Sequence, residues 1–349
     1  MRFPKPAYLL FLAAIPVAFT TSSLRAEEPA VKLFVSVAKA SAYHTVQDAI
    51  DHAPPAGATI FIAPGTYKEK ILIQKPNIRL IGTGRSPDSV VLTFGDSAKN
   101  TGSTFRSGTV TVLADSFAAE NISIINTWWD DHPAPADYSQ AVALHVISDR
   151  AVLDRVRLIS GQDTLYAASS TCRSSENPAT CHSSRQFFND SFIEGNVDYI
   201  FGDARAVFNR CELHSRQYPH IAITAQSRNS LDSDSAYFFL HCAITGPDEG
   251  DSVVFGRPWR TYAKVTFYDT DIRQKLAPEG WSEWEGRLRT ADYREYLSHG
   301  PGANPDRRAV AYPPLTPAEQ AELTPDCLLA GDDDWNPQKE VAALRQLVP

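Results

Sequence analysis

The sequence predicts an all-β fold built as a single solenoid of stacked coils, a parallel β-helix, on three observations. Short runs of β-branched and aromatic residues recur along the chain, and each is closed by Gly, Asn, Asp or Ser. No helical stretches separate these runs, which excludes a doubly wound α/β fold. Several runs also share a weak internal repeat, so we expect each repeat to contribute to one coil.

One short helix is expected before the first coils. It covers Tyr43–Ala53, where Val46, Ala49 and Ile50 fall on one face at helical spacing. The predicted strands follow as Thr59–Ile62, Ile71–Ile73, Ile78–Ile81, Val90–Thr93, Thr109–Val112, Ile122–Ile125, Ala141–Leu144, Val156–Ile159, Phe192–Ile193, Tyr199–Phe201, Ala206–Phe208, Ala222–Thr224, Tyr237–Leu240, Val253–Phe255 and Val265–Phe267.

The internal repeat sets the expected stacking of the coils. Its copies start 34, 35, 20 and 31 residues apart and cover Asn121–Ile125, Arg155–Ile159, Asp190–Glu194, Arg210–His214 and His241–Thr245. The shortest spacing suits one coil, and the longer spacings suit a coil that carries a loop. Equivalent positions of a parallel β-helix stack about 4.8 Å apart. The second residues of the copies should therefore form one column, Ile122, Val156, Ser191, Cys211 and Cys242.

Five cysteines allow two disulfides and one free thiol in an exported protein. Cys211 and Cys242 would lie on neighbouring coils, within reach of a disulfide, or they are two reduced thiols in the core. Cys172 and Cys181 bracket a polar segment and form the other candidate pair, which leaves Cys327 unpaired. None has the spacing of a zinc site, so we expect neither metal nor cofactor.

The two ends of the chain differ from the solenoid. Residues 1–26 have the pattern of a secretory signal, with Arg2 and Lys5 before an apolar stretch and Leu24–Ala26 as the cleavage site. Residues 27–349 should form one domain, located in the periplasm or outside the cell. From about Leu288 a Pro-rich, acidic tail is expected to pack on the solenoid, with helical patches at 317–323 and 340–347 and a solvated turn at 332–334.

The charge of the chain narrows the choice of partner. The net charge is −8, and it becomes −11 when Arg2, Lys5 and Arg25 leave with the signal. A protein this acidic is a poor candidate for binding nucleic acid or an anionic membrane, and no membrane contact is expected after signal cleavage. A neutral polymer is a better partner than one that carries free carboxylates.

Four short segments combine glycines, carboxylates, amides and aromatic residues: Gln140–Leu144, Gly161–Leu165, Gly195–Gly202 and Gly256–Trp259. Six more motifs accompany them in the same order as in a known family, namely Tyr43–Ile50, Gly65–Glu69, Gly82–Gly84, Ile223–Gln226, Gly280–Trp284 and Gly300–Ala303. Between Tyr43 and Pro337 the chain therefore resembles the pectin methylesterase family. Tyr199 and Phe255 differ mildly from the family pattern.

The resemblance implies a right-handed parallel β-helix, monomeric, that hydrolyses the methyl esters of galacturonate in pectin. Asp198 would be the nucleophile that forms an acyl-enzyme, and Asp163 would be the general acid and then the general base. Gln140 and Gln162 would donate to the oxyanion, and Arg257 would orient Asp198. Substrate contacts would come from Phe105, Tyr166, Phe201, Trp259 and Trp281, with Trp259 and Trp281 favoured most.

The chemistry of ester hydrolysis agrees with this set of residues. It needs a nucleophile, donors for the oxyanion and an acid for the leaving alkoxide, and two carboxylates in different environments can divide this work. Asp163 and Asp198 are 35 residues apart, but the Cys172–Cys181 segment resembles an insertion. Without it the interval is close to one coil, so the two aspartates should lie on adjacent coils. Trp128 and Trp129 lie in a loop longer than expected, whose role the sequence leaves open.

Four other functions compete with this interpretation. Gly95–Ser97 fits a serine esterase weakly, because no Asp-x-x-His segment and no Gly-x-Ser-x-Gly elbow occurs. The same fold could act on other esters or acyl thioesters, or bind polysaccharide without catalysis. Retention of both aspartates and both glutamines argues against simple binding. A polysaccharide lyase would need calcium-binding carboxylate clusters, which are not apparent.

Overall fold

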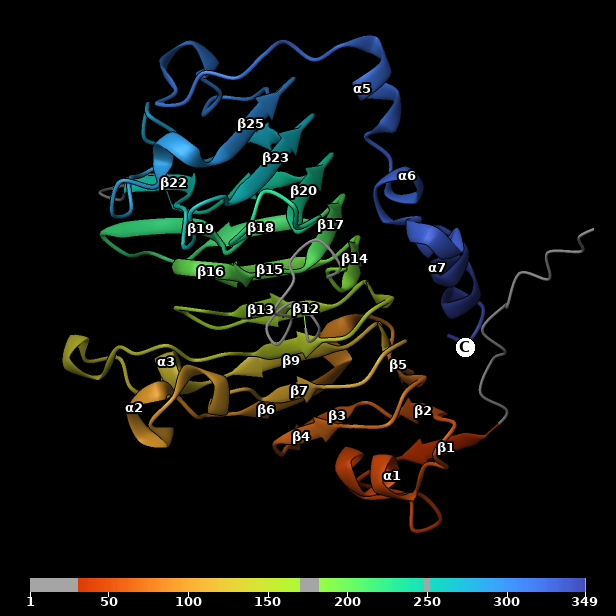
Figure 1. Ribbon diagram of the computed structural model, residues 1–349. Helices are drawn as coiled ribbons and strands as arrows, with labels where there is room; N and C mark the ends of the chain where they lie inside the picture. Colours follow the sequence, from red (N-terminus) through yellow and green to blue (C-terminus); the bar gives the residue numbers. More distant parts are fainter. Residues whose placement is uncertain (1–30, 170–181, 248–251, 349) are drawn as a thin grey trace, which may run out of the picture.

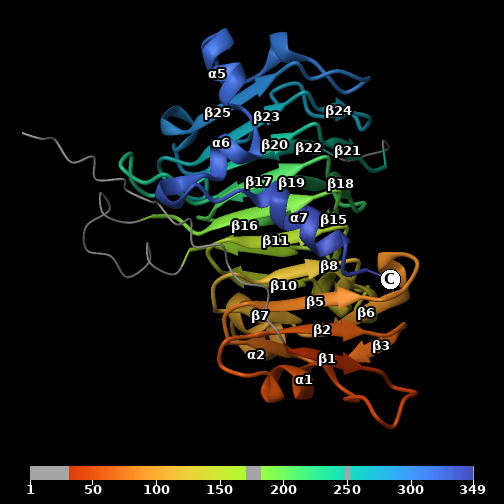
Figure 2. The same cartoon turned by 90° about the vertical axis from the view of Figure 1, so that its right-hand side faces the viewer.

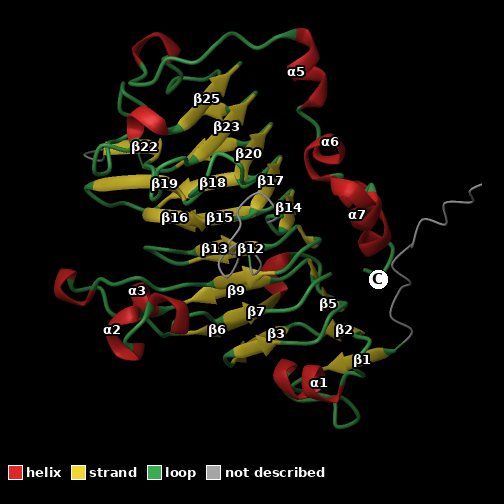
Figure 3. Ribbon diagram, in the orientation of Figure 1, coloured by secondary structure: helices red, strands yellow, loops and turns green. Residues whose placement is uncertain are grey.

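Three parallel sheets run along the molecule, because successive coils add their strands to the same faces (Figures 1 and 3). The computed structural model describes residues 31–169, 182–247 and 252–348. All strand pairs within these ranges are parallel, for example β2 with β5 and β13 with β16. The predicted parallel β-helix is confirmed. The predicted signal, residues 1–26, lies outside the described residues.

The ten-stranded sheet contains, in spatial order, β1 (Lys32–Val35), β2 (Ala58–Ile62), β5 (Ile78–Gly82), β8 (Ala118–Glu120), β11 (Ala151–Asp154), β14 (Arg185–Asn189), β17 (Arg205–Asn209), β20 (Ala236–Leu240), β23 (Lys264–Tyr268) and β25 (Asp292–Tyr296). The seven-stranded sheet contains β22 (Ser252–Gly256), β19 (His220–Gln226), β16 (Val197–Gly202), β13 (Leu165–Ala168), β10 (Leu144–Ile147), β7 (Val110–Val112) and β4 (Ile71–Ile73). The eight-stranded sheet contains β24 (Asp271–Ile272), β21 (Ala243–Thr245), β18 (Glu212–Ser215), β15 (Phe192–Gly195), β12 (Arg157–Ile159), β9 (Ser123–Asn126), β6 (Val90–Phe94) and β3 (Gly65–Lys68).

The helices are short and lie outside the coils. They are α1 (Val46–His52), α2 (Ala98–Thr101), α3 (Trp128–Asp131), α5 (Pro317–Glu322), α6 (Pro325–Leu329) and α7 (Pro337–Arg345). In α1 the Thr45 side chain caps the first turn by accepting from the Asp48 backbone N–H at 3.1 Å. The predicted face of α1 packs on β1, β2 and β4, so this helix covers one end of the solenoid. No helix among the described residues is long and apolar enough to cross a membrane.

The internal repeat marks a recurring corner between two of the sheets. The first residue of every copy has a left-handed backbone, with φ of 57° at Asn121, 50° at Arg155, 46° at Asp190, 52° at Arg210 and 55° at His241. In each copy, the residue directly after the column position pairs with its equivalent on the next coil. For example, Arg157 pairs with Phe192. The predicted column from Ile122 to Cys242 is therefore confirmed, and its side chains point into the core.

The cysteines of that column are free thiols. The Cys211 thiol donates to the Phe188 carbonyl at 3.4 Å, and the Cys242 thiol donates to the Phe208 carbonyl at 3.3 Å. Of the two alternatives, the structure has the reduced pair. Cys172 and Cys181 lie outside the described residues, so their predicted disulfide is not tested.

Stacked aromatic rings fill the centre of the later coils. Phe188, Phe208, Phe239 and Phe267 come from β14, β17, β20 and β23, with successive ring centroids 4.7, 4.5 and 4.4 Å apart. Their planes differ by only 8–11°. Because each coil contributes one ring, the stack binds four coils into one core.

The C-terminal tail packs along the outer face of the ten-stranded sheet, as expected (Figure 2). The helical patches predicted in the tail are α5 and α7. Arg345 of α7 donates to both carboxylate oxygens of Asp154, at 2.6 and 2.8 Å. Asp333 forms an ion pair with Arg185. The 332–334 segment is exposed and forms a turn, as predicted, and Asp333 within it also helps to anchor the tail through this ion pair.

One predicted strand is displaced. Ala141–Leu144 was expected to be a strand, but β10 begins only at Leu144. The preceding residues are fully buried, and the Ala141 N–H donates to the Gln162 carbonyl at 3.0 Å. Residues 141–143 therefore pack closely against the coil that contains Gln162, but they do not have regular strand geometry.

Candidate active site

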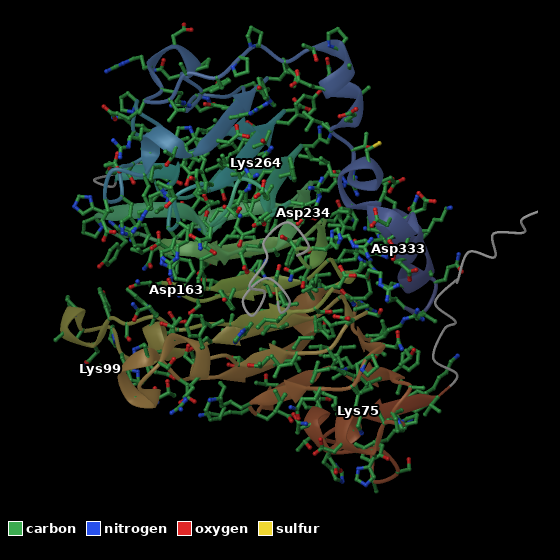
Figure 4. The ribbon with its side chains drawn as sticks, viewed as in Figure 1. Lys75, Lys99, Asp163, Asp234, Lys264 and Asp333 are labelled. Carbon is green, nitrogen blue, oxygen red and sulfur yellow. The ribbon has the colours of Figure 1, made fainter. Side chains whose placement is uncertain are left out.

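Asp163 and Asp198 lie on neighbouring coils of the seven-stranded sheet. Asp163 precedes β13 and Asp198 lies within β16, and these strands pair in register, with Tyr166 opposite Phe201. The Asp163 N–H donates to the Val197 carbonyl at 3.0 Å. The expected adjacency is therefore present. Figure 4 shows Asp163 on the same side of the solenoid as Lys99 of α2, away from Asp333 in the tail.

Both aspartates have left-handed backbones, with φ of 64° at Asp163 and 51° at Asp198. Such geometry costs roughly 1–3 kcal/mol for a non-glycine residue and is often found at functional sites. The ladder between β16 and β19 shifts register between Val197 and Ile200, and a bulge of this kind re-aims the side chain within it. The left-handed turns and the bulge thus set the directions in which the two carboxyl groups leave the sheet.

Gly195 allows the two turns to approach each other. A Cβ there would lie 2.6 Å from the Thr164 hydroxyl oxygen and 2.7 Å from the Gly161 carbonyl oxygen. These contacts are shorter than any that real Cβ atoms make. A larger residue at this position would push the Asp163 turn away from the Asp198 turn.

Arg257 holds Asp198 from the far side. Its Nε and Nη2 donate to the two carboxylate oxygens at 2.8 and 2.7 Å, a bidentate pair. The Arg257 guanidinium also lies 4.3 Å from the ring centroid of Trp284. The hydrogen bonds to Asp198 therefore fix the plane of the guanidinium, and the Trp284 ring packs against its face.

The environments of the two aspartates differ. Burial, followed by the charge of Asp198, raises the pKa of Asp163 well above its usual value, and Arg257 opposes this only in part. Burial also raises the pKa of Asp198, but there the hydrogen bonds and charge of Arg257 act against the rise. Within the described part of the chain, the Asp163 carboxyl has no hydrogen-bond partner. Of the two, Asp198 has the partner that favours its ionised form, and Asp163 is the one whose surroundings favour its protonated form.

Gln140 and Gln162 flank this pair on two successive coils. The Gln140 carbonyl accepts from Ala98 N–H at 2.8 Å, and the Gln162 carbonyl accepts from Ala141 N–H at 3.0 Å. Both side chains are half-buried. Among the described residues neither side-chain amide has a protein partner, so both amides are available to a ligand.

A row of side chains crosses the outer face of the same sheet at one register position. It consists of Leu72, Thr111, His145, Tyr166 and Phe201. A cavity of about 380 Å³ lies at the far end of this row and is lined in part by Lys70, Phe105 and Arg106. The row and the cavity form a path along the solenoid that leads to the two aspartates.

Aromatic contacts continue along this path. Phe105 lies 5.2 Å from Tyr166, Tyr166 lies 4.7 Å from Phe201, and Phe201 lies 5.9 Å from Trp259, measured between ring centroids. Phe105 is 41% exposed and Trp259 is half-buried, whereas Tyr166 and Phe201 are almost fully covered. Phe105 and Trp259 can therefore contact a ligand directly, while the other two rings support them.

The prediction for Trp281 as a sugar contact is wrong. Its side chain is 1% exposed and stacks on Tyr293 at 4.1 Å within the core. Trp284, three residues later, is half-buried and packs over Arg257 instead. Trp284 was not predicted as a site residue, although it belongs to the same motif, Gly280–Trp284.

Two other kinds of site are not found among the described residues. Ser97 of the weak serine-esterase match is fully buried and caps α2 by accepting from the Lys99 N–H at 3.1 Å. It cannot act as a nucleophile in this position. In the ranges that the structure describes, no group of three or more His, Cys, Asp or Glu side chains could hold a metal ion.

The sequence of this chain is similar to those of known proteins over most of its length. The family model described as Pectinesterase matches residues 32–332. Pectinesterase 2.1 of Solanum lycopersicum is 32% identical over 319 residues, which cover 86% of this chain and 54% of that protein. The chain spans about half the length of the first curated relatives it matches.

Solved structures match over nearly their whole length. Pectin methylesterase from carrot has a TM-score of 0.75 and 28% identity, covering 90% of this chain and 95% of that one. A pectin methylesterase in complex with hexasaccharide VII has a TM-score of 0.70 and 28% identity, covering 87% of this chain and 98% of that one. These are right-handed parallel β-helices, which confirms the handedness expected for the fold.

Proposed function

The chain belongs to the pectinesterase family, and from this premise we propose that it hydrolyses the methyl esters of galacturonate units in pectin and releases methanol. One observation carries the proposal. Asp198, held by two hydrogen bonds from Arg257, lies on the coil next to Asp163, a buried aspartate whose pKa is raised. This is the division of roles that a two-carboxylate esterase requires.

In the first half of the reaction the Asp198 carboxylate attacks the C6 carbonyl of the methyl ester. The carbonyl electron pair moves to the oxygen, where the side-chain amides of Gln140 and Gln162 would stabilise the negative charge. When the tetrahedral intermediate collapses, the bond to the methoxy oxygen breaks and Asp163 gives its proton to that oxygen. Methanol leaves, and an acyl-enzyme remains on Asp198.

In the second half Asp163, now ionised, accepts a proton from a water molecule. The resulting hydroxide attacks the acyl carbonyl, and the bond to Asp198 breaks. The product leaves as the free carboxylic acid and then loses its proton to solvent, while the Asp198 carboxylate and protonated Asp163 are restored, so protons and charges balance over the cycle. The raised pKa of Asp163 suits both of its roles, because a general acid works best with a pKa near the operating pH.

The groove supports a polymeric substrate. Exposed Phe105 and half-buried Trp259 offer faces for sugar rings at either end of the aromatic path. A related structure holds a hexasaccharide. The acidic chain, at −11 for residues 27–349, favours an esterified and therefore neutral galacturonan over its charged product. We propose further that the protein acts as a monomer outside the cytoplasm, needs no cofactor, and is exported by residues 1–26.

The test is methanol release from highly esterified pectin. Asp198→Ala should abolish turnover, whereas Asp232→Ala, which removes an exposed aspartate, should leave it unchanged. Thermal melting of the three proteins establishes that they are folded. Absence of methanol from folded wild-type protein would overturn the proposal.

Parallel assays separate the alternatives. Release of alcohol or thiol only from simple esters or thioesters would indicate a different substrate. Binding to pectin without methanol release would indicate a non-catalytic module, and unsaturated, ultraviolet-absorbing ends would indicate a lyase.

A further inference from the structure

The loop that contains α3 lies beside the active site, and its second tryptophan is locked in place. The Trp129 side chain is 7% exposed. Its ring stacks on Tyr138 at 4.1 Å with 25° between the planes, and it meets the edge of Tyr218 at 5.9 Å. Because Tyr218 comes from the loop before β19, aromatic contacts from two segments fix this indole.

Trp129 contacts the residue before Gln140. Its indole Nε1–H donates to the Ser139 carbonyl at 2.9 Å. That carbonyl belongs to the peptide bond that joins Ser139 to Gln140. The indole therefore fixes the orientation of the peptide plane that leads into Gln140. On the other side of Gln140, its own carbonyl accepts from the Ala98 N–H at 2.8 Å.

Trp129 also contacts the residue before Gln162. A Cβ on Gly161 would lie 2.3, 2.4 and 2.5 Å from three atoms of the indole ring. The ring therefore lies flat against the Gly161 backbone, and only glycine fits beneath it. Arg216 adds a polar link, because it donates to the Ser160 carbonyl at 3.3 Å and pairs with Asp130, the neighbour of Trp129.

We propose that Trp129 is a positioning residue that aligns Gln140 and Gln162 for the oxyanion. The inference rests on the proposed function, in which these two amides donate to the tetrahedral intermediate. One rigid side chain bridges the backbones that carry both amides, although they belong to successive coils. Donors of this kind must be aimed at the position of the oxyanion, and a displacement of about 1 Å can reduce the rate by about 10²-fold.

The loop offers a matched control in Trp128. This residue is also 7% exposed, and its Nε1–H also donates to a backbone carbonyl, that of Asp137, at 2.9 Å. Its ring stacks on His132 at 3.8 Å. Trp128→Phe and Trp129→Phe therefore remove the same group from the same loop, but only the second loses a bond next to a catalytic amide.

The kinetic experiment compares these two variants on esterified pectin. Trp129→Phe should lower kcat about tenfold with little change in KM, because the oxyanion is absent from the bound ester and forms only during the reaction. Trp128→Phe should keep kcat within about twofold of wild type. Gly161→Ala, which displaces the ring without altering it, should reproduce the loss of kcat. Equal effects of the two tryptophan variants, or a change confined to KM, would contradict the proposal.

A double-mutant cycle tests whether Trp129 acts through the amide. In a Gln140→Ala background, Trp129→Phe should lower kcat much less than it does in wild type, since residues that act as a unit are not additive. Full additivity would overturn the inference while leaving the esterase function intact.

A third measurement does not depend on activity. Hydrogen exchange of the Ala141 amide, which donates to Gln162, should accelerate in Trp129→Phe and not in Trp128→Phe. Failure of wild-type protein to release methanol would reject the proposed function, whereas equal exchange in both variants would reject the positioning role.

Discussion

Arg257 donates two hydrogen bonds to Asp198, one to each carboxylate oxygen, across the intervening strand β19. The arginine follows β22 and the aspartate lies in β16, so the pair joins coils that are not neighbours. A guanidinium in this fork geometry keeps the carboxylate ionised and fixes its orientation. Asp163, on the next coil, lacks such a partner and is free to keep its proton.

Arg257→Lys should reduce kcat/KM at least about tenfold, because an ammonium cannot replace the bidentate fork. The pKa of Asp198 should rise, since a well-placed cation that favours its charged form is lost. The acidic limb of the pH–rate profile should therefore move to higher pH. Arg273→Lys, which changes an arginine paired with Asp271 at the surface, serves as the control. An unmoved acidic limb would show that Arg257 does not govern the ionisation of Asp198.

Asp163→Asn should lower kcat by about 10²-fold or more, because asparagine cannot give up the proton that methoxide needs. The same change should stabilise the protein at neutral pH. The folded-state pKa of Asp163 is raised above its ordinary value of 3.8, so between these pKa values the unfolded chain has lost the proton and the folded chain retains it. Stability is then lost as pH rises through this window. Melting curves should show the gain near pH 7 and its disappearance near pH 3; a gain equal at both pH values would contradict the raised pKa.

The stacking of the coils could be predicted because one type of corner repeats. Each copy of the repeat starts with a residue of left-handed backbone and continues with a core side chain. Even a weak resemblance among segments such as Asn121–Ile125 and Arg210–His214 was therefore enough to predict the register of the coils. Strands such as β8, with the sequence Ala-Ala-Glu, were missed. Their residues have low β-propensity, and pairing with strands on both sides overrides that preference.

The site could be predicted only in part. The adjacency of Asp163 and Asp198 followed from their spacing once the insertion was set aside. The two tryptophans of Gly280–Trp284 could not be distinguished in the same way, because the sequence does not show which one points inward. A bridge between Gly256 and Trp281 continues the strand pairing and turns Trp281 to the core. The bridging role of Trp129 depends on contacts among three loops, which no local pattern reveals.

Trp281 and Trp284 should therefore respond differently to replacement. Trp281→Ala removes a core ring and should lower the free energy of unfolding by about 3–5 kcal/mol. Trp284→Ala removes a half-buried ring, so it should cost less stability and should reduce kcat/KM, since the ring over Arg257 is lost. Denaturant unfolding and pectin kinetics on both variants measure the contrast. Similar losses of stability in the two variants would be inconsistent with the difference in burial between Trp281 and Trp284.

Phe239 is the clearest test of the aromatic core. Its ring lies between Phe208 at 4.5 Å and Phe267 at 4.4 Å. Phe239→Ala should cost about 3–5 kcal/mol by leaving a cavity, and Phe239→Leu should cost less because leucine fills part of the space. Phe105→Ala, at an exposed ring, should have little effect on unfolding. Equal effects of Phe239→Ala and Phe105→Ala would mean that the stack does not hold the coils together.

Glu120 gives the protein a second pH dependence, remote from the active site. This side chain is fully buried, and burial together with the neighbouring Asp154 raises its pKa to about 8, although Arg155 donates to it at 2.6 Å. Because its ordinary pKa is 4.5, the folded protein retains a proton between pH 4.5 and about 8 that the unfolded chain has lost. Glu120 therefore destabilises the fold progressively as pH rises through this range.

Glu120→Gln should remove this loss, since glutamine remains neutral while keeping a similar shape. The melting temperature of the variant should exceed that of wild type most at pH 8, and the difference should shrink toward pH 4. Methanol release should be unchanged, because Glu120 lies in the ten-stranded sheet and the candidate active site lies on the seven-stranded sheet. A constant difference in melting temperature across this range would mean that the carboxyl ionises in the same way in the folded and unfolded chains.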